Sequence, residues 1–169
     1  MTLPFFRAQI VAIALFVGWG SPTIGYGAPG RFLPNLTEVV RPAVSVRSLD
    51  DAAVELRLAL PLHHAINREA PGRVTLRIPS LGDVLVGESP LDEPNVVVPV
   101  HIPPDVKARP AKNELVVEAV VYYCEETKKA ICKIKSLRIF QPVTIDSASD
   151  SSVIVIDGTA VEAATPSTT

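Results

Sequence analysis

Two cysteines, Cys124 and Cys132, are the residues of this 169-residue chain whose type and spacing are best suited to chemistry. The seven residues EETKKAI separate them, and each lies at the end of an apolar run with the alternation of a β-strand. If these runs form a hairpin, the two Cα atoms come to about 4.5–5.5 Å. That separation falls within the range of about 4.4–6.8 Å that a disulfide accepts, so we expect a Cys124–Cys132 bond.

Such a bond has two interpretations. As a structural cross-link it would contribute about 2.5 kcal/mol through the entropy of a short closed loop. As a redox pair, Cys124 and Cys132 would exchange with the thiols of a partner protein, and nearby charges would set how readily a thiolate forms. Glu125 and Glu126 would disfavour the thiolate, and three lysines would favour it: Lys128, Lys129 and Lys133.

The other candidate groups offer little chemistry. His63 and His64 follow Pro61 in an expected loop, and His101 falls on the solvent face of an expected strand, so we interpret all three as surface residues. The acidic pairs Asp50-Asp51 and Glu125-Glu126 fit solvated turns. Two cysteines without an adjacent histidine fall short of the four ligands of a structural zinc site. We therefore expect no metal, no cofactor, no small-molecule substrate and no catalytic residues of the chain's own.

Composition narrows the function classes further. The 16 Lys and Arg residues against 18 Asp and Glu residues give a formal charge of −2, which is unfavourable for nucleic-acid binding. Apolar residues make up 47% of the chain, too many for general disorder. Sixteen prolines and nine glycines, scattered without a repeat, favour short elements separated by turns. One compact domain is the expectation.

The N-terminal 27 residues have the features of an export signal. Arg7 precedes an apolar run, residues 10–17, and Gly25 and Gly27 provide small residues before a cleavage site at Ala28. We therefore expect an exported protein, periplasmic or secreted, with membrane attachment only if this segment stays uncleaved. Residues 28–41 are interpreted as a linker or irregular lead-in that contains the glycosylation tripeptide Asn35-Leu36-Thr37, and residues 159–169 as a disordered tail.

Between these ends the apolar residues alternate with polar ones, as in strands that have one buried face. Val54, Leu56 and Leu58 show the pattern most clearly, and Pro99 places its run at a sheet edge because proline cannot donate to a ladder. A change of phase near Lys135-Ser136 suggests a bulge. The expected strands are residues 43–47, 53–60, 73–78, 84–86, 95–102, 114–124, 131–145 and 152–156.

No helical stripe of a dozen residues follows position 28, and the segments between the strands are too short for helical crossovers. We therefore predict an all-β fold over residues 42–158, an antiparallel two-sheet immunoglobulin-like sandwich of about eight strands.

Two segments resemble a known family. Residues 61–78 (PLHHAINREAPGRVTLRI) and 116–145 (VVEAVVYYCEETKKAICKIKSLRIFQPVTI) resemble the C-terminal β-domain of thioredoxin-like proteins with NHL repeats. More distantly, they are similar to the immunoglobulin-like N-terminal domain of the DsbD-type thiol:disulfide interchange proteins. The similarity rests on an Asn-x-x-Ala-Pro turn, on Tyr-Tyr-Cys at Tyr122 to Cys124 with a second cysteine, and on Pro142-Val143; it covers about 110 residues.

The resemblance implies that Cys124 and Cys132 correspond to a redox pair that passes electrons to exported proteins. It also implies a thioredoxin-like or membrane redox protein as a partner supplied in trans, because the chain contains neither of those parts. One position departs from the NHL-associated domain, in which an aromatic residue follows Ala-Pro. This chain has Gly72-Arg73-Val74 there. We accordingly expect an accessory binding module with a structural disulfide, or else a thiol:disulfide exchange carrier.

Overall fold

The structure is a computed structural model that describes residues 33–161, apart from residues 105, 107–110 and 128–130. The chain divides into two units, Met1–Arg31 and Phe32–Thr169, and only the second is described below. The predicted export signal with its cleavage site and residues 28–32 of the lead-in lie outside the described residues, as do residues 162–169 of the predicted tail. Within the described residues, no helix is long and apolar enough to cross a membrane.

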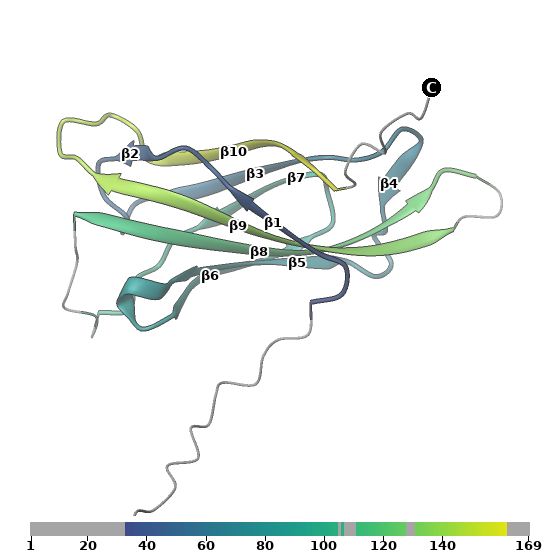
Figure 1. Ribbon diagram of the computed structural model, residues 1–169, viewed down its shortest axis with the longest axis horizontal. Coiled ribbons are helices and arrows are strands. Elements are labelled where there is room, and N and C mark those ends of the chain that lie inside the picture. The colour runs from purple at the N-terminus through teal and green to yellow at the C-terminus, as the bar shows by residue number, and fades with distance from the viewer. Residues whose placement is uncertain (1–32, 105, 107–110, 128–130, 162–169) are drawn as a thin grey trace, which may run out of the picture. The chain divides into compact units, whose positions relative to one another are not determined.

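The described chain forms two β-sheets, so the predicted all-β sandwich is confirmed (Figure 1). The large sheet has the order β1-β9-β8-β5-β6, with β2 also paired to β9 and β4 to β8. Its strands are β1 (Leu36–Val40), β2 (Val44–Val46), β4 (His64–Ile66), β5 (Gly72–Ile78), β6 (Val84–Leu91), β8 (Lys112–Glu125) and β9 (Cys132–Ile145). The small sheet has the order β10-β3-β7, with β3 (Ala53–Ala59), β7 (Asn95–Pro99) and β10 (Val153–Ala160). A short 3₁₀ turn, Pro79–Leu81, precedes β6.

The sheets are mixed, which corrects the prediction of a purely antiparallel arrangement. Strands β1 and β2 both run parallel to β9, and β10 runs parallel to β3. The prediction considered only connections between consecutive strands, which are too short for parallel crossovers. These parallel pairs instead join strands about a hundred positions apart in the chain, so no short crossover is needed.

Several boundaries differ from the prediction. Strand β6 runs to Leu91 instead of ending at residue 86, and β7 ends at Pro99 instead of residue 102. Residues 36–40 of the expected irregular lead-in form strand β1, because they add to the edge of β9. Residues 64–66 form strand β4 rather than a loop, because they pair with β8. Strand β10 continues through a break in register at Gly158 to Ala160, and Val161 is fully buried, so the domain extends past residue 158.

The core lies between the sheets and consists almost entirely of Val, Leu and Ile side chains, as the alternation predicted. Val54, Leu56 and Leu58 of β3 and the odd-numbered residues of β8 from Leu115 to Tyr123 point into it. Pro99 ends β7, an edge strand of the small sheet, which confirms its predicted position.

The predicted bulge near Lys135-Ser136 is absent. Strands β8 and β9 stay in one register from Lys112 opposite Thr144 to the two cysteines. Ser136 and its neighbour Leu137 are both fully buried because β9 is an interior strand of the large sheet. Burial on both faces, rather than an extra residue, therefore accounts for the loss of alternation in the sequence.

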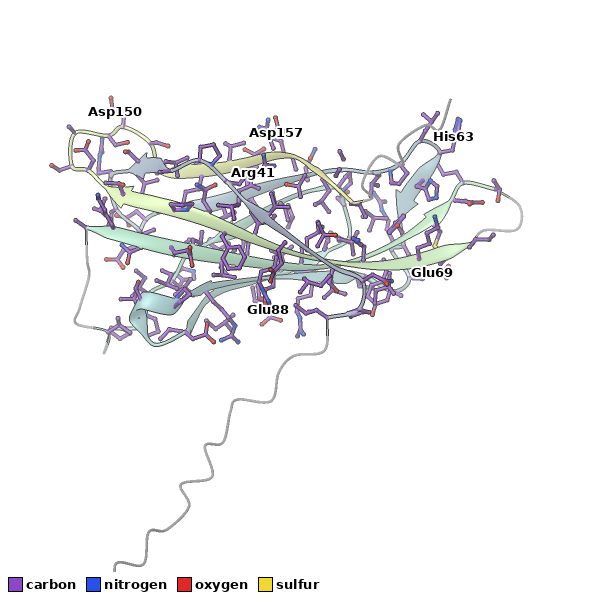
Figure 2. The ribbon with its side chains drawn as sticks, in the orientation of Figure 1. Arg41, His63, Glu69, Glu88, Asp150 and Asp157 are labelled. Atoms are coloured by element: carbon purple, nitrogen blue, oxygen red, sulfur yellow. A yellow bond between two sulfur atoms is a disulfide. The ribbon has the colours of Figure 1, made fainter. Side chains whose placement is uncertain are left out.

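Arg41, between β1 and β2, links the large sheet to the small one through hydrogen bonds to β10. Its guanidinium Nη2 donates to the carbonyl oxygen of Asp157 at 2.5 Å and to Oγ1 of Thr159 at 2.9 Å. Figure 2 shows Arg41 beside Asp157. A second connection between the sheets is a backbone hydrogen bond from the amide of His101 to the carbonyl of Val86, 2.6 Å long.

Candidate functional site

The predicted disulfide between Cys124 and Cys132 is present at the end where β8 and β9 leave the sheet. Figure 2 shows its sulfur–sulfur bond there. The two residues lie directly opposite each other, with their Cα atoms 4.0 Å apart, slightly closer than expected. The amide of Glu125 donates to the carbonyl of Ile131, so the cysteines occupy the neighbouring non-hydrogen-bonded position, where antiparallel strands are closest.

The two cysteines differ in accessibility. Cys132 is exposed, whereas Cys124 is half-buried because Ala65 of β4 lies opposite it on the other side of β8. The segment before β4 also contacts the hairpin, since the amide of Glu126 donates to the carbonyl of His63 at 2.9 Å. A reagent approaching from solvent would therefore reach Cys132 more readily than Cys124.

The disulfide lies on the outer face of the large sheet, which we define as the face that carries the even-numbered residues of β8. The small sheet packs against the opposite face, where the odd-numbered residues are buried. Register places the outer-face side chains in successive rows across the strands. The disulfide is followed by Tyr122 opposite Ile134, then by Val120 opposite Ser136.

A groove of about 760 Å³ crosses these rows beside the disulfide. Most of its lining is apolar, and an ion pair forms part of one wall. The lining residues are Pro34, Pro71, Gly72, Arg73, Glu88, Ser89, Pro90, Val120, Tyr122 and Ile134. They come from β5, β6, β8 and β9 and from the segments that precede β1 and β5, so the groove runs across the strands.

Gly72 allows the chain to join the sheet next to this groove. A Cβ atom placed on Gly72 would lie 1.9 Å from the carbonyl oxygen of Val120, a backbone atom that cannot move aside. Any larger residue would push β5 away from β8. This contact is a physical reason for glycine at position 72.

Next to the groove lies a charged row, defined as Glu38, Arg138, Glu118, Arg73 and Glu88. Arg138 donates to Glu118 and Glu38 at 2.9–3.0 Å, and Arg73 donates to Glu88 at 3.2 Å. Partial burial lowers the pKa of Arg138, but the hydrogen bonds to Glu118 and Glu38 outweigh it and raise the pKa overall. Three carboxylates against two guanidiniums leave the row with a net charge of −1.

The histidines take no part in this site. His64 begins β4, where its Nδ1 donates to the carbonyl of Leu62 at 2.9 Å and its ring lies 5.6 Å from that of Tyr123. The prediction of an unpartnered surface side chain is therefore wrong for His64. It lies next to Ala65 in the strand and so faces away from the disulfide. His63 and His101 are exposed, as predicted, but His101 follows the end of β7 and does not lie on the expected strand.

Only one of the two acidic pairs lies wholly in a turn. Asp50 and Asp51 are exposed turn residues, as predicted, whereas the prediction is wrong for Glu125, which is the half-buried last residue of β8. Among the described residues, no group of three or more His, Cys, Asp or Glu side chains is placed to hold a metal ion.

The sequence interpretation missed the groove. Tyr122 and Val120 lie on the second face of the strand predicted at residues 114–124, and the sequence shows that this face is itself partly apolar. The partly apolar second face was the available signal. When both faces of a strand carry apolar residues, either other elements cover both faces or one face is a binding surface. The other walls come from Pro71, Pro90 and Arg73, which only the strand order brings together.

No protein-family model matches the chain, and no curated protein matches its sequence. The resemblance to the DsbD-type N-terminal domain therefore stays a prediction.

Proposed function

We propose that this chain is an exported β-sandwich of the DsbD N-terminal-domain type that acts as a non-catalytic binding module. The observation that carries the proposal is the groove on the outer face of the large sheet, immediately next to the disulfide. A concave site of several hundred cubic ångströms, with apolar walls and a few polar groups, is the usual form of a binding site.

In this proposal the disulfide stabilises the part of the hairpin that lines the groove. Strands β8 and β9 are 14 residues long, and the Cys124–Cys132 bond joins them where their pairing ends. Tyr122 and Ile134, which line the groove, are the next outer-face pair along the same strands. A covalent bond at this point limits fraying of the pair and holds the two side chains in place.

The reduction potential of the Cys124–Cys132 bond tests this role. The purified oxidised protein is equilibrated with a dithiothreitol redox series, the thiols are alkylated, and intact mass gives the reduced fraction. A structural bond is expected below about −300 mV, where glutathione cannot reduce it. A value of about −120 to −270 mV, the range of exchange proteins, would contradict the structural role.

A second candidate function is thiol:disulfide exchange, and the exposure of Cys132 favours it. A thiolate of a thioredoxin-like or membrane redox partner would attack Sγ of Cys132, and Cys124 would leave as a thiolate. The second thiol of the partner would then resolve the mixed disulfide, so that the partner is oxidised and this chain holds two thiols. Electrons would pass from this dithiol to the disulfide of an exported protein.

Single-cysteine variants distinguish the two functions. With Cys124→Ser, a carrier is expected to accumulate a mixed disulfide through Cys132 when mixed with an oxidised thioredoxin-like protein, because the internal resolving thiol is gone. Cys132→Ser is the matched control, since its remaining thiol is half-buried. Equal and slow reaction of both variants would reject exchange and leave the binding module.

A further inference from the structure

The groove beside the disulfide is long enough to hold an extended peptide that runs across the strands. It crosses the strand order from the segment before β1 to β6, a path of four inter-strand steps. Neighbouring strands lie about 4.8 Å apart, so this path is about 19 Å long. An extended chain advances about 3.3 Å per residue, so about six residues would span it.

The walls indicate how such a peptide would be held. The backbone groups of β8 and β9 beneath the groove already pair within the sheet. The rim residues Pro34, Pro71 and Pro90 have no backbone N–H to donate. A peptide in this groove would therefore bind through its side chains, with apolar residues against Tyr122 and Ile134, rather than by adding a strand.

The charged row sets the polarity of the ligand. Arg73 and Glu88 both line the groove and pair with each other, so the net charge of −1 comes from Glu38, Arg138 and Glu118, which border the groove along one side. A cationic side chain in the peptide would complement this charge, whereas an acidic one would be repelled.

From these features we propose that the groove binds an extended peptide segment of an exported partner protein, with apolar side chains on the floor and one basic side chain toward the charged row. The inference deepens the proposed binding function and rests on it. It assigns the specificity to Tyr122, Ile134 and Glu88, and it leaves the disulfide as a support for the groove.

The test uses the oxidised, ¹⁵N-labelled protein and a capped hexapeptide of valine and proline with one central arginine. Titration followed by amide chemical shifts is expected to perturb residues of the groove, on β5, β6, β8 and β9, and not β3 or β7 of the small sheet. Replacing the central arginine of the peptide by glutamate is expected to weaken binding at least about tenfold, because one attraction becomes a repulsion. Equal affinity for the two peptides, or shifts confined to the small sheet, would overturn the proposal.

Variants of the protein locate the site. Tyr122→Ala is expected to weaken binding about tenfold, as loss of a central aromatic contact does. Val97→Ser is the matched control, because Val97 is an exposed strand residue on the small sheet, and it should bind normally. Each variant is first shown to be folded by its amide spectrum. If Tyr122→Ala is not folded, Glu88→Gln replaces it, with an expected loss of the preference for arginine over glutamate.

Two further measurements separate this proposal from its alternatives. A neutral hexasaccharide tests whether the tyrosine instead stacks on a sugar, and its binding in the groove in place of the peptides would overturn the proposal. The folded double variant Cys124→Ala/Cys132→Ala tests the support role. If the oxidised protein binds the peptide but its disulfide has a high reduction potential, the groove proposal stands and the structural role of the disulfide is rejected.

Discussion

Removing the disulfide should lower the free energy of unfolding by an amount that follows from the size of its loop. Cys124 and Cys132 are eight positions apart, so the double variant Cys124→Ala/Cys132→Ala frees a very short loop in the unfolded chain. The loop-entropy relation gives about 8.3 cal/mol/K for eight residues, which is about 2.5 kcal/mol at 25 °C. For a domain of about 130 residues, that loss should lower the Tm by roughly 9 °C.

Urea denaturation followed by circular dichroism measures this change, with reduction of the wild-type protein by dithiothreitol as the matched perturbation. The two treatments should agree, because both remove the same cross-link. Amide hydrogen exchange shows which strands are destabilised when the disulfide is removed. Protection should fall first at Tyr122 and Ile134, the next outer-face pair along β8 and β9, and least in β3 of the small sheet.

The entropic reasoning would be refuted by a loss below about 0.5 kcal/mol, which would show that removing the bond does not free the loop in the unfolded chain. Complete unfolding would refute it in the opposite direction, because a cross-link this short supplies only about 2.5 kcal/mol.

Three further predictions concern single side chains. Gly72→Ala should lower the free energy of unfolding by at least about 3 kcal/mol, because the new Cβ meets the carbonyl of Val120. Gly82→Ala is the control: the position has open space but a φ of +85°, so the loss in the same urea assay should be about 1 kcal/mol. Equal losses for the two variants would contradict the contact argument. Arg41→Ala should lower the free energy of unfolding by about 1–3 kcal/mol and reduce hydrogen-exchange protection in β10. Unchanged protection in β10 would show that Arg41 does not hold the two sheets together. Ser136→Ala should leave stability unchanged or raise it by about 1 kcal/mol, because the buried hydroxyl of Ser136 has no hydrogen-bond partner among the described residues; a clear loss in calorimetry would reveal one.

The strands that could be predicted are those whose burial is one-sided. Val54, Leu56 and Leu58 alternate with polar residues because only one face of β3 meets the core, and that alternation is visible in the sequence. The disulfide was also predictable, because two cysteines at the ends of successive strands meet as soon as a hairpin forms.

The parts that were not predictable depend on distant partners. Residues 36–40 become strand β1 only because the edge of β9 accepts them, and no local pattern records that edge. His64 is ordered by β8 and by the carbonyl of Leu62, and neither interaction follows from its neighbours in the sequence. The groove likewise combines Pro34, Pro71 and Pro90 through strand order alone.

The parallel pairing of the outermost strands has a consequence for how the domain folds. Leu36 pairs with Ser136 and Ala53 pairs with Val153, so each closure spans 100 positions of the chain. Such contacts raise the contact order, and chains with many non-local pairings fold in milliseconds to seconds rather than microseconds. Strand β3 also acquires its neighbour β10 only when the last residues of the domain are available. A nascent chain shorter than about 160 residues would expose that edge of β3, so folding should be completed only after synthesis of the domain has finished.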